Sequence, residues 1–162
     1  MLTVRPLKSD DVEAYRGIRL EGLEMAPDAF ASTLAREQTF SREDFSHRLQ
    51  NGPTLGAFDG DALVGVVGLV IAAGEKERHK GTLVGMYVRQ SARGRGVGQA
   101  LIEALLAAAA REVEQVNLAV AQDNIVARRL YERCGFSAYG LEKHSLKFRG
   151  RYFDDVLMAR FF

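Results

Sequence analysis

The chain has 162 residues, of which nearly half are apolar, so it is long and apolar enough for one domain with a substantial core. Its 22 lysines and arginines almost balance its 21 aspartates and glutamates, so no overall field favours nucleic acid or a membrane as the principal partner. No secretory signal or membrane-spanning segment is visible, and a single cysteine, Cys134, excludes an internal disulfide and a cysteine-based zinc cage. We expect one domain over residues 1–162, located in the cytoplasm.

The N-terminal third predicts an edge strand and two helices. Residues 2–7 are typical of an edge strand, and Asp10 is placed to cap a helix that ends near Met25. After a loop, Ser41 and Asp44 mark the start of a second helix. The strand and both helices precede the region in which the hydrophobic pattern changes to the two-residue period of a sheet.

The rest of the chain predicts a sheet with further helices. Two β-rich runs, 54–58 and 63–72, flank the tight-turn sequence Asp59-Gly60-Asp61 and indicate an antiparallel hairpin. A strand at 83–88, a helix at 98–111, a strand at 116–120 and a helix at 125–133 follow. Two strands at 136–147 and 152–161 then form a closing hairpin. Strands connected through a helix should be parallel and the hairpins antiparallel. We therefore expect an α/β fold with a mixed, mostly antiparallel central sheet flanked by helices.

A glycine-rich turn, Arg93-Gly94-Arg95-Gly96-Val97-Gly98, joins a predicted strand to a helix. Such a turn offers backbone N–H groups and the positive end of a helix to a phosphate, and glycine allows close approach. A Walker A loop requires Gly-Lys-Ser/Thr, whereas Gly98 is followed by Gln99 and Ala100, and the GxGxxG dinucleotide spacing lacks its third glycine. On its own the turn fits either an anion-binding loop or a purely steric turn.

Two segments resemble the GNAT N-acetyltransferase superfamily. Residues 88–98 resemble its acetyl-CoA pyrophosphate loop, Gln/Arg-x-x-Gly-x-Gly/Ala, with Arg93, Gly96 and Gly98 in the defined places. Downstream, the series Asn124, Ala127, Tyr131 and Gly135-Phe136 is similar to the family's asparagine, helix tyrosine and Gly-Phe turn. The resemblance extends over the element order of the whole chain. It implies a GNAT-like fold with a splayed parallel strand pair at the cofactor site.

The resemblance also implies an acetyl-CoA-dependent N-acetyltransferase, in which a primary amine attacks the thioester directly within a ternary complex. In the family, the strand before the loop pairs through its backbone with the pantetheine arm of coenzyme A, and the loop amides surround the pyrophosphate. The implied cofactor-binding residues are Met86, Tyr87, Val88, Arg93, Gly94, Arg95, Gly96, Val97, Gly98, Gln99 and Asn124. Asn124 equally suits the N-cap of the following helix, and both roles can hold at once.

Tyr131 is implied as the catalytic residue. A phenol with a pKa of about 10 can give a proton to the departing thiolate, although a tyrosine on an amphipathic helix is also suited to packing. An oxyanion donor is expected from a backbone N–H near Met86 to Val88.

The general base is not identified. Many relatives place a glutamate on the strand entering the loop, whereas residues 81–86 contain no acid. Glu77, His79, Glu21 and Glu24 remain candidates, with the alternative that each is a surface residue. No metal is expected, because the three histidines are far apart in the sequence.

Two other function classes remain open at this point: an acyl-CoA sensor or protein acetyltransferase with a macromolecular partner, and a nucleotide-binding module without catalysis. The acceptor surface is expected in the first two helices, residues 27–38 and the closing hairpin. Phe30 and Phe40 in this region, with nearby acids, are consistent with a cation site or with ordinary loop chemistry. The apolar C-terminal strand fits a homodimer contact or a place in the core.

Overall fold

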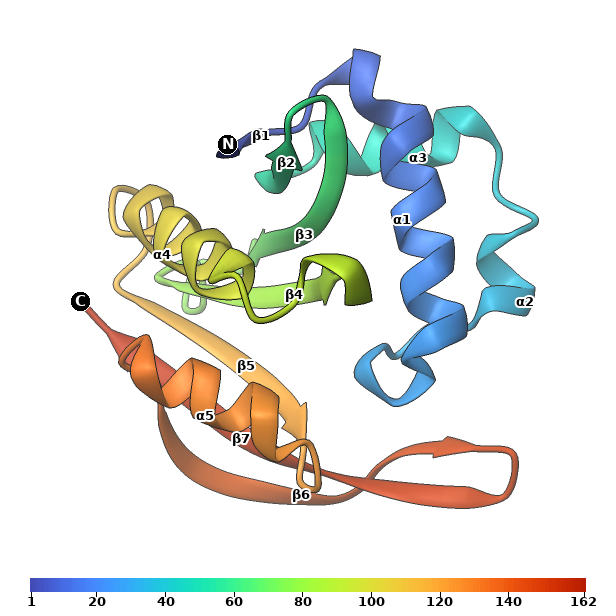
Figure 1. Ribbon diagram of the computed structural model, residues 1–162. Coiled ribbons are helices and arrows are strands. Elements are labelled where there is room, and N and C mark those ends of the chain that lie inside the picture. Colours follow the sequence, from blue (N-terminus) through green and yellow to red (C-terminus); the bar gives the residue numbers. More distant parts are fainter.

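The computed structural model describes all residues from Met1 to Phe162 and is organised around one seven-stranded sheet of order β1-β2-β3-β4-β5-β7-β6 (Figure 1). The strands are β1 (Leu2–Pro6), β2 (Thr54–Asp59), β3 (Ala62–Ile71), β4 (Lys80–Val88), β5 (Gln115–Ala121), β6 (Ser137–Phe148) and β7 (Arg151–Phe161). The helices are α1 (Val12–Met25), α2 (Leu34–Glu37), α3 (Arg42–Gln50), α4 (Val97–Ala109) and α5 (Ile125–Arg133).

The sheet is mixed and mostly antiparallel, as predicted. Only β4 and β5 run parallel, and they pair over a short stretch, Lys80–Thr82 against Gln115–Asn117. Beyond Thr82 the two strands diverge, and the rest of β4 pairs with β3 alone. Figure 1 shows β4 and β5 spreading apart between α4 and α5. The predicted splayed parallel pair is therefore present, and it leaves one backbone edge of β4 without a strand neighbour.

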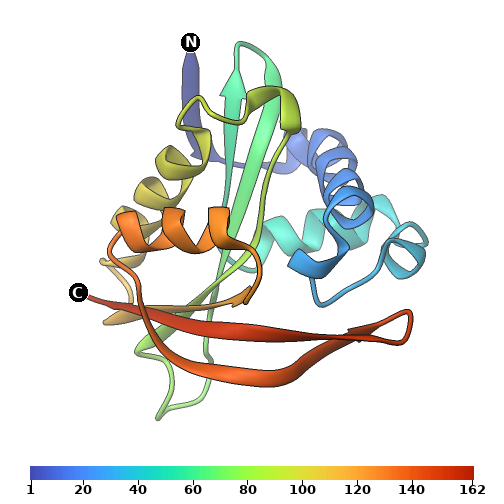
Figure 2. The same cartoon turned by 60° about the horizontal axis from the view of Figure 1, so that its bottom comes forward.

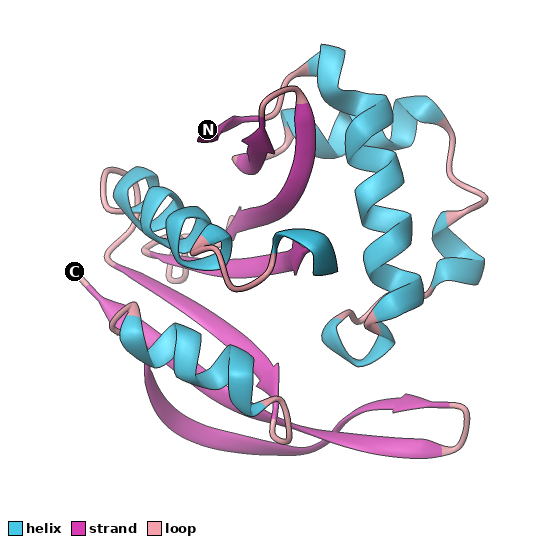
Figure 3. Cartoon of the chain, in the orientation of Figure 1, coloured by secondary structure: helices cyan, strands magenta, loops and turns pink.

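Helices cover both faces of the sheet (Figure 3). The central strand β3 is apolar on both faces, because alternate residues enter different cores: Val66 packs in the cluster under α1 and α3, and Val67 in the cluster under α4. Fully buried Ile18 and Phe45 anchor the first cluster, and Leu101 the second. Burial of such side chains contributes about 1.5–3 kcal/mol each, so the two cores hold the diverging strands in place.

A bulge bends β4 where it leaves β5. The pairing of β3 with β4 shifts register between Val66 and Gly68, and Gly85 opposite this shift has a φ of +62°. A left-handed φ strains any residue with a Cβ atom, so glycine suits the bulge. A Cβ atom at Gly85 would also lie 3.1 Å from Nη1 of Arg19. The bulge therefore lets α1 bring an arginine against the backbone of β4.

Two local predictions about the N-terminal region were wrong. Asp10 is exposed and caps nothing, because a 3-10 turn over Ser9–Asp11 precedes α1. Asp11 instead accepts a 2.8 Å hydrogen bond from the Lys8 backbone N–H and pairs with Arg5. The expected loop before Ser41 also contains the short helix α2, capped by the Thr33 hydroxyl.

Most other local predictions are confirmed, and one strand boundary differs. Ser41 and Asp44 form a reciprocal capping box at α3, and the turn at Gly60 has the left-handed φ of its hairpin. β4 starts three residues earlier than predicted, at Lys80, because its first residues pair with β5. Cys134 is buried, as expected of a small apolar side chain. No helix is both long and apolar enough to cross a bilayer.

The apolar C-terminal strand contributes mainly to the core. Val156 and Met158 of β7 are buried, whereas Phe161 and Phe162 at the end of the chain are exposed. A homodimer contact at these exposed rings stays a prediction.

Candidate active site

The glycine-rich turn lies between a 3-10 turn at Gln90–Ala92 and the start of α4. Gly94 and Gly96 have φ values of +75° and +78°, the region in which glycine is favoured. Because Val97 begins α4, the N–H groups of its first turn have no upstream carbonyl in the helix. The turn therefore presents backbone donors together with the positive end of a 13-residue helix.

The arginine side chains of this turn point to neighbouring elements. Arg93 Nε donates to the backbone oxygen of Val88 at 3.0 Å, and Arg95 pairs with Asp59 at 2.9 Å. These contacts engage one nitrogen of each guanidinium, whereas the backbone N–H groups of residues 94–99 make no hydrogen bond to the backbone. Gly98 packs tightly, because a Cβ atom there would lie 2.9 Å from Leu130 of α5. Glycine thus lets the start of α4 approach α5.

The side chains of the three predicted residues of β4 are divided between the two faces of the sheet. Met86 lines the cavity described below, and Val88 packs against the core under α4. The Tyr87 side chain lies on the other face, where its hydroxyl donates to Glu21 at 2.9 Å. A cofactor in the gap would therefore meet Tyr87 through its backbone only.

A cavity of about 720 Å³ opens where β4 and β5 diverge. Its walls come from β3 and β4, the end of β5, α5, the three N-terminal helices and the β6–β7 hairpin. Figure 2 shows the hairpin reaching past β5 toward the N-terminal helices, so segments far apart in sequence surround one space. The predicted acceptor region, the first helices with the closing hairpin, does line this cavity.

Tyr131 and Asn124 both line the cavity. Tyr131 is 6% exposed, and burial raises the pKa of its phenol well above the usual value. Its ring packs edge-on against Phe136, and its hydroxyl makes no hydrogen bond within the protein. Asn124 Oδ1 accepts a 3.2 Å hydrogen bond from the Ala127 N–H, which confirms the N-cap role and leaves the side-chain amide nitrogen for another partner.

None of the four candidate bases lines the cavity. Glu77 and Glu24 are exposed, and His79 lies just before β4. Glu21 pairs with Arg89 at 3.2 Å. The carboxylates that do line the cavity are Asp28, Glu37 and Asp155. Sequence reasoning pointed to Glu37 and Asp28 only as two of the acids near the aromatic rings of the expected acceptor region, and it did not point to Asp155.

Glu37 lies at the centre of a buried ion cluster that joins the three N-terminal helices. Its fully buried carboxylate accepts from Arg19 Nε and Nη2 at 3.0 and 2.9 Å, and from Arg48 Nη1 at 2.7 Å. Burial alone would raise the pKa of Glu37, but the hydrogen bonds from the two arginines outweigh it and lower the pKa to about 2. Glu37 is therefore ionised at neutral pH and unsuited to accept a proton.

The aromatic rings of this region are covered by the chain's own cations. Arg19 lies 4.7 Å from the centre of the Phe30 ring, and Arg48 lies 5.3 Å from that of Phe40. Each of these rings therefore already has a guanidinium of the chain close to it. No group of three or more His, Cys, Asp or Glu side chains is arranged to hold a metal ion.

Comparison with known proteins places these features in a family. The model of the acetyltransferase (GNAT) family matches residues 20–136, more than two thirds of the chain. An acetyltransferase of the GNAT family from Streptococcus pneumoniae superimposes with a TM-score of 0.88 at 21% identity over 100% of both chains. A ribosomal-protein-alanine N-acetyltransferase from Brucella melitensis gives 0.87 at 24% identity over 99% of both chains.

A proposed acetyltransferase from Salmonella typhimurium, solved with its cofactor acetyl-CoA, gives a TM-score of 0.86 at 18% identity, over 99% of this chain and 93% of that one. At these identities the three structures establish a shared fold.

Proposed function

The chain belongs to the acetyltransferase (GNAT) family, and we propose that it transfers the acetyl group of acetyl-CoA to a primary amine by direct attack within a ternary complex. The observation that carries this proposal is the cavity at the divergence of β4 and β5, which has Tyr131 in its wall. The acetyl-CoA in the Salmonella structure supports the same cofactor here.

The residues of this chain fit coenzyme A. The unpaired edge of β4 at residues 83–88 offers backbone N–H and C=O groups to the amides of a pantetheine arm, as an added strand would meet them. The turn from Gly94 to Gln99 offers its amides and the start of α4 to the pyrophosphate, whereas the Arg93 N–H already donates to the Gln90 oxygen at 3.2 Å. The free amide nitrogen of Asn124 lies in the same cavity. When bound, the thioester supplies an activated acetyl group.

In the proposed reaction the amine nitrogen bonds to the thioester carbonyl carbon as the carbon–sulfur bond breaks. Tyr131 gives its phenolic proton to the departing sulfur and is reprotonated by the proton that the amine releases. Its raised pKa keeps the phenol protonated at neutral pH, the state that this role requires. Backbone N–H groups at the β4 bulge are suited to stabilise the developing negative charge on the carbonyl oxygen.

A protein N-terminus is a second candidate acceptor. The Brucella neighbour is described as acting on alanine of a ribosomal protein, and it covers 99% of this chain. A cavity of about 720 Å³ lined by the N-terminal helices and the hairpin is compatible with a peptide end.

Release of free thiol from acetyl-CoA tests the proposal. The purified chain is offered polyamines, amino acids, aminoglycosides and peptides, and thiol is measured against time. We expect amine-dependent release with at least one class and formation of the N-acetylated amine. Tight binding of acetyl-CoA without transfer to any acceptor would instead indicate a sensor.

A further inference from the structure

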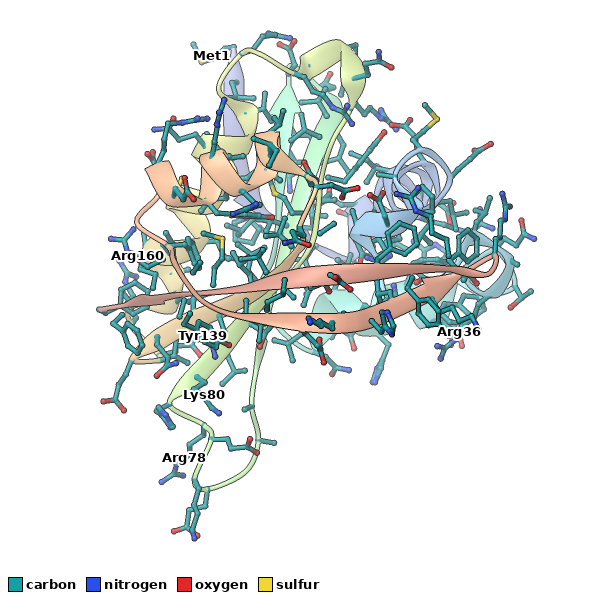
Figure 4. The ribbon with its side chains drawn as sticks, turned by 90° about the horizontal axis from the view of Figure 1, so that it is seen from below. Met1, Arg36, Arg78, Lys80, Tyr139 and Arg160 are labelled. Carbon is teal, nitrogen blue, oxygen red and sulfur yellow. The ribbon has the colours of Figure 1, made fainter.

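The charged residues that line the cavity are divided between its two sides. The side built by the N-terminal helices carries Arg19, Arg36 and Arg48 against Asp28 and Glu37, which leaves one positive charge in excess. The opposite side, built by the hairpin, carries Asp155 alone. Figure 4, in which Arg36 is labelled, shows the hairpin and the N-terminal helices from below. The cavity is therefore electrically polarised.

The positive side retains unused hydrogen-bond donors. Glu37 takes two bonds from Arg19 and one from Arg48, so a single carboxylate serves two guanidinium groups. Arg19 Nη1 makes no hydrogen bond and lies beside the Gly85 bulge of β4. Arg19 is 14% exposed and Arg48 is 34% exposed, so each is partly shielded from water but reachable from the cavity. Shielding strengthens their attraction for an anion.

The negative side consists of a buried carboxylate without a cationic partner. Asp155 is 7% exposed and pairs with Ala121, at the end of β5, in the sheet register. Its Oδ2 accepts a 2.7 Å hydrogen bond from the Ser145 hydroxyl, and no lysine, arginine or histidine forms an ion pair with it. A buried carboxylate that faces a cavity gains most from a positively charged ligand group.

We propose that the acceptor is a small zwitterion, an amine that also carries a carboxylate or another anionic group. Its ammonium group lies at Asp155 and its anionic group lies at Arg19 and Arg48. The ammonium group releases one proton to water before the attack on the thioester, because only the neutral amine has a free electron pair. This inference rests on the proposed function and narrows its substrate class. Polycations such as polyamines are disfavoured, because the excess positive charge on the helical side repels their second amine.

Matched acceptors that differ only in charge test the anionic subsite. The kcat/KM of the wild-type chain is measured for a panel of amino acids and for their carboxamides, which retain the size and the amine but lose the negative charge. We expect at least one amino acid to exceed its carboxamide by about tenfold or more, the worth of one charge-assisted hydrogen bond. Equal rates for every acid and amide pair, or a preference for polyamines, would overturn the proposal.

Arg48→Gln removes the excess charge while the bidentate pair of Arg19 with Glu37 stays. We expect the acid-to-amide ratio to fall to within about threefold of unity, since the cavity loses its excess positive charge and one of the two guanidinium groups of the anionic subsite. Arg42→Gln is the matched control on α3, because Arg42 pairs with Glu13 outside the cavity. The control should retain the wild-type ratio. An unchanged ratio in Arg48→Gln would contradict the proposal.

Asp155→Asn tests the ammonium subsite. We expect kcat/KM to fall by about tenfold or more for every amine, with the acid-to-amide ratio preserved, because both members of each pair carry the ammonium group. Asp154 directly precedes Asp155 on β7 and lies outside this cavity, so Asp154→Asn serves as the control. Unchanged activity in Asp155→Asn would remove this subsite. Absence of thiol release with any amine would refute the proposed function itself, whereas release without charge discrimination would refute only this inference.

Discussion

Burial determines the protonation state of Tyr131. The phenol lies in the cavity wall with no hydrogen-bond partner, so its ionised form gains no compensating contact and its pKa rises. A phenol held protonated in this way still carries its proton when the carbon–sulfur bond breaks and the sulfur becomes basic. The residue is therefore suited to donate a proton late in the reaction and unsuited to act as the initial base.

Replacing Tyr131 by phenylalanine tests this role. Tyr131→Phe removes only the hydroxyl, so we expect kcat to fall by about 100-fold, the usual worth of a positioned general acid. The dissociation constant for acetyl-CoA should stay within about twofold of the wild-type value. Tyr139→Phe is the control, because Tyr139 is 61% exposed on β6. Unchanged kcat in Tyr131→Phe would exclude Tyr131 from the mechanism.

The Glu37 cluster makes a pH-dependent contribution to stability. The pKa of Glu37 is about 2 when folded, below the ordinary 4.5, so the stabilisation is complete above about pH 4.5 and is lost as the pH falls toward 2. Melting temperatures measured between about pH 5 and pH 3 should fall more steeply for the wild type than for Glu37→Gln. Parallel curves of melting temperature against pH would show that folding does not lower the pKa of Glu37.

At the scale of elements, the turn before α4 combines a steric requirement with its proposed role in binding the cofactor. Gly96→Ala forces a side chain into a left-handed φ and should cost about 1–2 kcal/mol. Gly150→Ala is a matched control, because Gly150 has the same φ of +78° and open space around its Cβ position. Both variants should melt at lower temperature, but only Gly96→Ala should weaken acetyl-CoA binding, measured by calorimetry. Equal affinities of Gly96→Ala and the wild type for acetyl-CoA would show that the turn does not bind the cofactor.

Features controlled by neighbours in sequence could be predicted from the sequence. The Ser41–Asp44 capping box, the hairpin turn at Gly60 and the boundaries of α5 all depend on contacts within a few residues. Even so, the sequence did not show which of the adjacent acids Asp10 and Asp11 precedes α1. The 3-10 turn over Ser9–Asp11 places Asp11 there.

Residues that act through tertiary contacts could not be predicted. Glu37 lies in a four-residue helix within a polar segment, and its partners are 18 and 11 residues away. Asp155 is one of two adjacent acids on β7. It lines the cavity because β7 pairs with β5 in a register that sets Asp155 opposite Ala121. The glycine-rich turn is continuous in sequence and carries its own signature, whereas the proposed acceptor wall is assembled from the N-terminal helices and the distant hairpin.

At the scale of the whole molecule, two rigid layers hold the reacting groups. The cores under α1 and α4 fix the divergence of β4 and β5, and the hairpin closes the cavity from the other side. Under the proposed function, the donor site lies along the edge of β4 and the acceptor site lies between the helices and the hairpin. Acceptor specificity can therefore change through the N-terminal helices while the coenzyme A platform is retained.

The effect of acetyl-CoA on thermal stability tests the central claim most directly. A ligand that binds the folded chain at a hundredfold excess over its dissociation constant stabilises it by about 2.7 kcal/mol, a rise of roughly 5–10 °C for a domain of this size. We predict a continuous rise in melting temperature as acetyl-CoA is titrated through about 1 μM to 1 mM, displaced to higher concentration in Gly96→Ala. A melting temperature that does not change at any concentration would contradict the assignment of the β4–β5 gap and the glycine-rich turn to coenzyme A.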